Sequence, residues 1–164
     1  MRKYSSPINI IIKIIIGIFI LLTAFTIYSL MYNLLNDTDY AYLMNQTIHR
    51  VDGDNLEPDY NVDDILILKK EYTYNEGDVI LFKYYDSYKL GIVNDIISGE
   101  YILSDNTDSI DEDYEVTDDN VYGKVTFKLK GFGIVYNILI SPFMIVFTFL
   151  LVGAYYFLTM GDRA

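Results

Sequence analysis

Two long apolar runs enclose a more polar middle. The first, Ile8 to Leu30, has one charge, at Lys13, and is long enough to cross the roughly 30 Å hydrocarbon layer of a bilayer as a helix. Lys13 lies near the N-terminal end of this run, where its side chain can reach the headgroups. The second run, Ile134 to Met160, is broken at Pro142, and the part after this proline is just long enough to span. The pattern predicts two membrane-spanning helices.

Each run has an alternative interpretation. The first could be a cleaved secretory signal, but signal h-regions reach only about 7 to 15 residues, and no A-x-A-like cleavage site follows. We expect an uncleaved anchor. The second could be a helix buried in a soluble core, but the short middle segment is too small to cover two such helices in water.

Residues 37 to 131 alternate between apolar and polar positions with the period of two that is typical of strands. Turn signals such as Asp86-Ser87 and Ser98-Gly99 separate the segments. The acidic stretch 104–120 is expected to be a loop. The expected strands are residues 65–70, 78–85, 88–97, 100–103 and 121–130. The fold class is therefore mainly β, a small antiparallel β domain flanked by N- and C-terminal transmembrane helices.

The organisation follows from these elements. It comprises a tail at 1–7, a transmembrane helix at 8–35, a β domain at 36–133, an interfacial segment with a second transmembrane helix at 134–160, and a tail at 161–164. Arg2, Lys3 and Lys13 favour a cytoplasmic N-terminus, and Arg163 favours a cytoplasmic C-terminus. Three lysines beside the second span oppose this assignment: Lys124, Lys128 and Lys130. Two spans with both tails in the cytoplasm place the β domain outside the plasma membrane.

Charge and composition narrow the possible partners and cofactors. The formal net charge is −11, and nearly all the acids lie in the middle segment, so nucleic acid is excluded as a partner. The absence of Cys excludes disulfides and thiolate metal sites. The acidic stretch lacks the sixth-position Gly and twelfth-position Glu of an EF-hand, and a solvated loop is expected instead. No metal and no other cofactor is predicted.

Five short motifs occur in order along the chain. Gly53, Asp54, Asn55, Leu56, Glu57 and Pro58 are followed by Asp63-Asp64 and an apolar strand. Gly77-Asp78 opens the next strand, Ser104, Asp105, Asn106 and Asp111 form a third motif, Gly123-Lys124-Val125 a fourth, and "GFGIVYNILISPF" the last. Together they resemble type I signal peptidase, in its small two-span branch of the archaeal, ER and spore-forming bacterial type. The resemblance implies a mostly β domain held against the bilayer that cleaves leader peptides from exported proteins.

The chain departs from this family where the chemistry should occur. Asn55 stands at the position of the nucleophilic serine, and a carboxamide has no hydroxyl to deprotonate. Gly91 aligns with the catalytic His, and Lys89, two residues away on the same strand face, is the nearby candidate base. Asp111 aligns with the orienting carboxylate, whose role is to hold a His tautomer. Asp105 lies nearby, and nothing in the sequence sets it opposite Asp111 as in an aspartic protease.

The resemblance implies that an extended peptide lies along a strand edge, in the manner of β-augmentation. We expect a non-catalytic protein that binds a leader or membrane-proximal peptide, or a membrane partner, beside the lipid bilayer. The expected binding residues are Gly53, Asp54, Leu56, Pro58, Leu90 and Val93.

Two alternatives stay open. One is an active signal peptidase with a displaced nucleophile, and the other is a structural domain that is merely tethered at both ends. Lys89 would serve as base for one of four candidate hydroxyls: Thr47, Ser87, Ser98 and Ser104. The lone His49 precedes the nucleophile position, whereas the family's His follows it, so we expect a hydrogen-bonded or solvated residue rather than a base.

Overall fold

The computed structural model describes residues 7–36, 38–53, 56–104 and 113–161. Two compact units emerge from its internal packing, one formed by the N-terminal segment together with the residues from Val135 onward, the other spanning Tyr42–Ile134. The first unit contains the long apolar helices and the second contains the strands.

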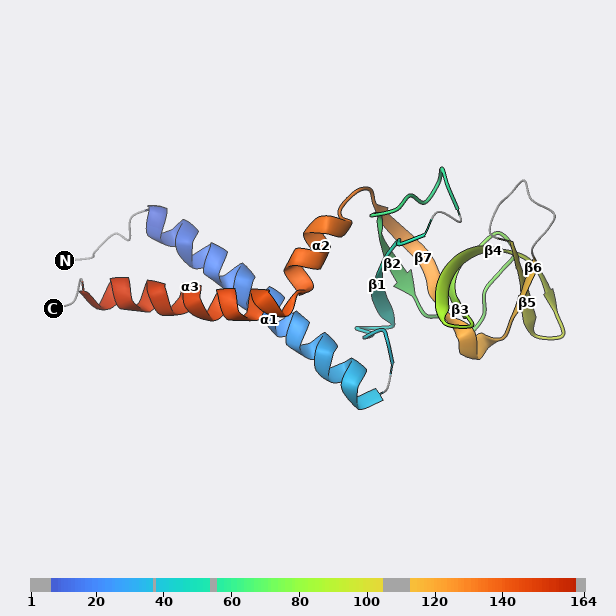
Figure 1. Ribbon diagram of the computed structural model, residues 1–164, viewed down its shortest axis with the longest axis horizontal. Helices are drawn as coiled ribbons and strands as arrows, with labels where there is room; N and C mark the ends of the chain where they lie inside the picture. The colour runs from blue at the N-terminus through green and yellow to red at the C-terminus, as the bar shows by residue number, and fades with distance from the viewer. Residues whose placement is uncertain (1–6, 37, 54–55, 105–112, 162–164) are drawn as a thin grey trace. The chain divides into compact units, whose positions relative to one another are not determined.

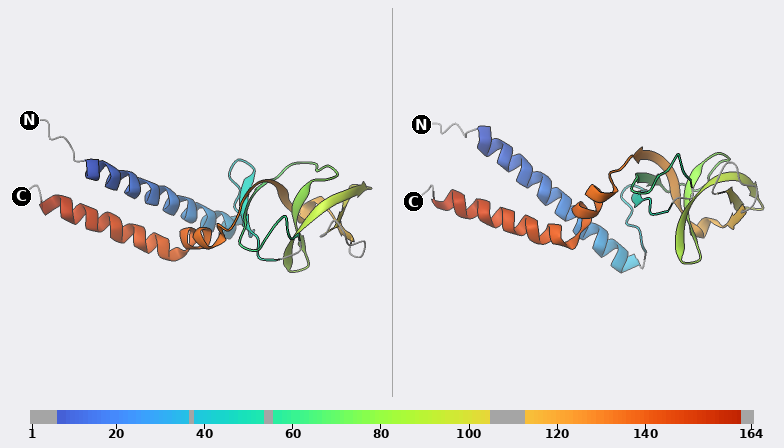
Figure 2. Two further views of the ribbon diagram at one scale, coloured as in Figure 1. Left: turned by 90° about the horizontal axis from the view of Figure 1, so that it is seen from above. Right: turned by 45° about the horizontal axis from the view of Figure 1, so that its top comes forward.

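The helical unit contains α1 (Pro7–Asn36), most of α2 (Gly133–Ile140) and α3 (Pro142–Gly161). Two of its helices, over Asn9–Asn36 and Pro142–Thr159, are long and apolar enough to cross a membrane. In Figures 1 and 2, α1 and α3 lie side by side, and Thr23 Oγ1 donates a 2.8 Å hydrogen bond to Thr148 Oγ1 between them. The segment before Pro142, expected at the interface, forms the separate helix α2, which ends at Ile140.

The strand unit is one curled antiparallel sheet with the order β1-β2-β7-β3-β4-β5-β6 (Figures 1 and 2). Its strands are β1 (Gln46–Arg50), β2 (Ile65–Lys69), β3 (Val79–Tyr84), β4 (Ser87–Ile97), β5 (Glu100–Ser104), β6 (Asp113–Val116) and β7 (Val121–Leu129). A 3₁₀ turn, η1 (Asp118–Asn120), leads into β7. β4 is the longest strand, and its first part pairs with β3 while its second part pairs with β5.

The five expected strands correspond to β2, β3, β4, β5 and β7. The expectation of a loop over 104–120 was wrong in part, because β6 lies within it. The side chains of Tyr114 and Val116 are buried in the core, at 4% and 2% exposure, while Glu115 between them is exposed. This is the alternation of a strand, but the many acidic residues of the stretch hide it in the sequence. β1 was also missed, because four of its five residues are polar.

Both faces of the sheet are buried at β3, where Ile80, Leu81 and Phe82 are all inaccessible to solvent. This burial explains why β3 reads as a continuous apolar run rather than an alternating one. The face that carries Ile80 and Phe82 holds a cluster that we call the aromatic core: Tyr74, Ile80, Phe82, Val93, Tyr101, Leu103, Tyr114, Val116 and Val121. The opposite face carries buried leucines, among them the cross-strand pair Leu81 and Leu90.

Two aspartates brace the start of β2 against the segment that follows β7. The Asp64 carboxylate, 2% exposed, accepts hydrogen bonds from the backbone N–H groups of Gly131 at 2.9 Å and Asn61 at 3.2 Å. Arg50 Nε donates to Asp63 Oδ1 at 2.8 Å, and the Asp63 carbonyl accepts from Gly133 N at 2.8 Å. Because a buried polar group without a hydrogen-bond partner costs roughly 1–3 kcal/mol, these bonds fix the turn that precedes β2.

Candidate functional site

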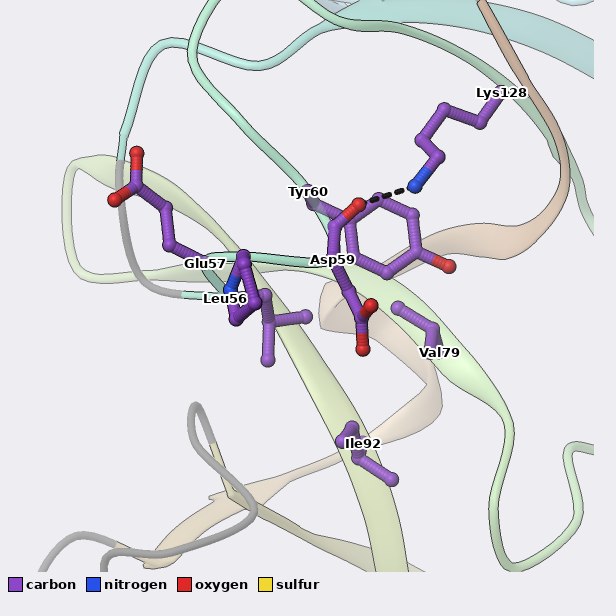
Figure 3. A pocket seen from close by; sticks show the side chains of 8 residues that line it. Leu56, Glu57, Asp59, Tyr60, Val79, Ile92 and Lys128 are labelled. Carbon is purple, nitrogen blue, oxygen red and sulfur yellow. Dashed lines mark hydrogen bonds between the residues drawn. The ribbon is translucent and has the colours of Figure 1, made fainter. Parts of the chain in front are cut away.

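A pocket of about 260 Å³ lies in the strand unit where residues 56–60 cover β3 and β4 (Figure 3). The pocket is lined by residues from the turn at 56–60, from the paired strands β3 and β4, and from the end of β7. Its described lining consists of Leu56, Glu57, Pro58, Asp59, Tyr60, Val79, Ile92 and Lys128.

The turn is held closed by local hydrogen bonds. Tyr60 N donates to the Leu56 carbonyl at 2.9 Å, and the Asn61 side-chain amide donates to the Pro58 carbonyl at 2.9 Å. Asn61 N also donates to the buried Asp64 carboxylate, which ties the turn to the start of β2. Leu56 is buried at 7% exposure, so it forms the inner wall of the pocket rather than its rim.

The sheet supplies the remaining walls. Val79 and Ile92 are direct cross-strand partners on β3 and β4, and they form an apolar floor. Lys128 reaches in from β7, donates a hydrogen bond to the Asp59 carbonyl and lies over the Tyr60 ring at 4.7 Å (Figure 3). Burial raises the pKa of the Tyr60 phenol, and the negative charge of Asp59 raises it further.

Some of the residues predicted to bind a peptide lie together in the structure. Leu56 and Pro58 line the pocket, whereas the half-buried Gly53 is not among its lining residues. Asp54 lies outside the described residues, as do Asn55 at the nucleophile position and the family-equivalent acids Asp105 and Asp111.

On β4 the predicted residues are buried in the sheet. Leu90 is 2% exposed on the leucine face, and Val93 is 1% exposed within the aromatic core. Ile92, which stands between them, lines the pocket instead. The sequence reasoning missed it because the prediction combined residues from both faces of one strand, and the period-two rule was the signal that could have found it.

The positions equivalent to the family's base lie on the other face of β4. A Cβ at Gly91 would lie 2.9 Å from Phe82 Cε1 and 3.1 Å from Leu103 Cβ, so this position faces the aromatic core. Lys89 shares that face, as the alternation predicts, and its Nζ donates a 2.7 Å hydrogen bond to the Tyr114 hydroxyl. Neither residue is among those that line the pocket.

The candidate hydroxyls are dispersed over the sheet. Thr47 is buried on β1, Ser87 donates to the Tyr84 carbonyl at the β3–β4 turn, and Ser98 stands in the β4–β5 turn. Ser104, also buried, donates to Asn94 Oδ1 at 3.3 Å. Within the described residues, none of the four shares a hydrogen bond with Lys89.

His49 is buried on β1, 7% exposed, opposite Leu66. Desolvation lowers its pKa from 6.5 to about 4, although the charge of Asp52 acts in the opposite direction. The imidazole is therefore neutral at physiological pH, and it is not among the residues that line the pocket.

The described lining of the pocket has no Ser, Thr, Cys or His that acyl transfer could use. A phenol with a raised pKa, such as that of Tyr60, is a weak nucleophile near neutral pH. Among the residues that the structure describes, no group of three His, Cys, Asp or Glu side chains is placed to hold a metal ion. The described lining therefore offers apolar surface together with the charged side chains of Glu57, Asp59 and Lys128.

Substitution of Gly91 tests the orientation of β4. Gly91→Ala is expected to destabilise the strand unit by about 1–3 kcal/mol, because the added methyl must displace Phe82 or Leu103. For a domain of this size each kcal/mol lowers Tm by roughly 4–8 °C, which thermal unfolding followed by tyrosine fluorescence can measure. Ile97→Ala, at an exposed position of the same strand, serves as the control and should leave Tm nearly unchanged. An unchanged Tm for Gly91→Ala would show that this position does not face the core.

The neutral buried His49 predicts a pH dependence of stability. The folded-state pKa of His49, about 4, lies below the unfolded value of 6.5. Its contribution to the free energy of unfolding is therefore complete above pH 6.5 and is lost as the pH falls toward 4. The loss amounts to about 3 kcal/mol. His49 is the only His in the chain, so a single imidazole NMR signal reports its titration. A midpoint near 6.5 would contradict the burial, and His49→Gln should flatten this part of the stability profile.

Comparison with known proteins adds no family assignment. No protein-family model matches the chain, and no curated protein matches it.

Proposed function

We propose that this chain is a membrane-anchored protein of the signal peptidase type that binds an extended peptide without cleaving it. The bound peptide is a leader segment or a membrane-proximal segment of a partner. The β unit stands outside the plasma membrane, and both termini lie in the cytoplasm. This topology is supported by two helices of spanning length and by the positive charges at Arg2, Lys3 and Arg163.

One observation carries the proposed binding. Leu56 and Pro58, from the motif that surrounds the missing serine, line the same pocket as Ile92, the neighbour of Gly91. These segments are far apart in the sequence, and the resemblance assigns both to peptide contact. A volume of about 260 Å³ lies just below the roughly 300–1,000 Å³ of small-molecule sites, and it suits one side chain of a longer ligand.

The substituted positions support the absence of cleavage. Asn55 offers no hydroxyl, and Gly91 offers no titrating group. Lys89, the remaining candidate base, donates to Tyr114 on the face of β4 opposite to Ile92. A peptidase with a displaced nucleophile would need a hydroxyl beside Lys89, and none of the four candidates is hydrogen-bonded to it within the described residues.

Site-directed crosslinking separates a peptide-binding domain from a merely structural one. Because the chain has no Cys, Ile92→Cys provides a sole thiol for a benzophenone maleimide at the pocket. The full-length chain that carries the benzophenone is irradiated in nanodiscs with a fluorescein-labelled synthetic preprotein fragment that contains an apolar leader and an Ala-x-Ala junction. We expect a saturable adduct that excess unlabelled fragment suppresses, with the fragment otherwise intact.

Tyr72→Cys is the matched control, because Tyr72 is 94% exposed and does not line the pocket. It should give little adduct, and that little should not saturate. Equal adduct yields at the two positions, or none at Ile92→Cys, would refute peptide binding at the pocket and favour the structural domain. Cut fragment would instead favour an active peptidase.

A further inference from the structure

The charge inside the pocket suggests which side chain it accepts. In Figure 3, the Asp59 carboxylate points between Val79 and Ile92, whereas that of Glu57 points away from them. Among the described residues, no ion pair or side-chain hydrogen bond engages the Asp59 carboxylate. The described lining therefore combines apolar walls with the Asp59 carboxylate, which forms no ion pair with the described residues.

The nearby cation does not neutralise this carboxylate by direct contact. Lys128 Nζ donates to the Asp59 carbonyl and lies over the Tyr60 ring, whereas the Asp59 carboxylate is drawn at the opposite end of that residue (Figure 3). Burial is the larger cause of the raised pKa of the adjacent Tyr60 phenol, and the negative charge of Asp59 raises this pKa further. The Asp59 carboxylate is thus the charged acceptor that points between Val79 and Ile92 (Figure 3).

The walls match a side chain with an apolar stem and a cationic end. Leu56, Val79 and Ile92 can cover a stem of three or four methylene groups, as apolar surfaces commonly do for Lys and Arg. A carboxylate that meets an ammonium or guanidinium forms a charge-assisted hydrogen bond, which is stronger than a neutral one. The net charge of −11 further attracts a basic segment before contact.

We propose that this pocket binds a lysine or arginine side chain of the bound peptide, with the Asp59 carboxylate as its counter-ion and Leu56, Val79 and Ile92 around its stem. The inference rests on the proposed function, because it names the residue type that the peptide presents at this pocket. The ligand is an extended peptide segment that carries a basic residue.

A set of matched peptides tests the charge preference. The probes are fluorescein-labelled heptapeptides Ala-Val-Ala-X-Ala-Val-Ala, in which X is lysine, arginine, norleucine or glutamate. Norleucine keeps the four-carbon stem of lysine and removes the ammonium. Binding to the full-length chain in nanodiscs of zwitterionic lipid is followed by fluorescence anisotropy, with empty nanodiscs subtracted. We expect the lysine and arginine peptides to bind about tenfold more tightly than the norleucine peptide.

The same peptides are then tested on the protein variant Asp59→Asn, which keeps the shape of the side chain and removes its charge. This variant should bind the lysine and norleucine peptides equally, while Asp119→Asn, at an exposed position away from the pocket, should keep the tenfold preference. An unchanged Tm for Asp59→Asn verifies that the fold persists. The preference should also shrink with added salt, because part of it is Coulombic.

The outcomes distinguish this inference from the proposed function. Equal affinity of the wild-type chain for the lysine and norleucine peptides overturns the inference and leaves peptide binding in place. A lysine preference that survives in Asp59→Asn also overturns it. If no heptapeptide binds while the preprotein fragment still crosslinks to Ile92→Cys, the pocket does not select a basic residue and only the inference fails. If binding and crosslinking are both absent, both proposals fail.

Discussion

Successive side chains of a β-strand point to opposite faces of the sheet, and on β4 this constraint separates two environments. Gly91 and Val93 face the aromatic core, where Phe82 and Leu103 fill the space beside the glycine. Ile92, between them, faces the pocket. A side chain larger than hydrogen at Gly91 would therefore enter a packed core instead of reaching the pocket. The position that the resemblance assigns to a catalytic base is thus structural in this fold, and the adjacent residue, Ile92, lines the pocket.

Much of the fold could be predicted from sequence, because apolar runs and period-two alternation are local signals. Five strands and both long helices follow from them. β1 and β6 were hidden by polar and acidic residues, although Tyr114 and Val116 of β6 are buried. The insertion of β7 between β2 and β3 depends on pairing between distant segments, which no local pattern encodes.

The candidate site was predictable only where a motif marks it. Leu56 and Pro58 were expected from the segment around Asn55, but Tyr60, Val79 and Ile92 were not. Lys128 enters the pocket from the far end of β7, whose register against β2 shifts at a bulge between Ile67 and Leu68. A shift of one residue reverses the face on which a side chain lies, so the sequence alone does not place Lys128.

Holding a peptide and cutting it require different atoms, which is why the proposed loss of chemistry is compatible with a retained pocket. The proposed binding uses apolar walls and a carboxylate, whereas acyl transfer needs an activated hydroxyl. The most direct test is intact-mass spectrometry of a leader-bearing preprotein that has been incubated with the chain in nanodiscs. The fraction of preprotein bound to the chain is determined in the same sample. The account predicts saturable binding and an unchanged preprotein mass over days. A specific cleavage product that accumulates with time would contradict it.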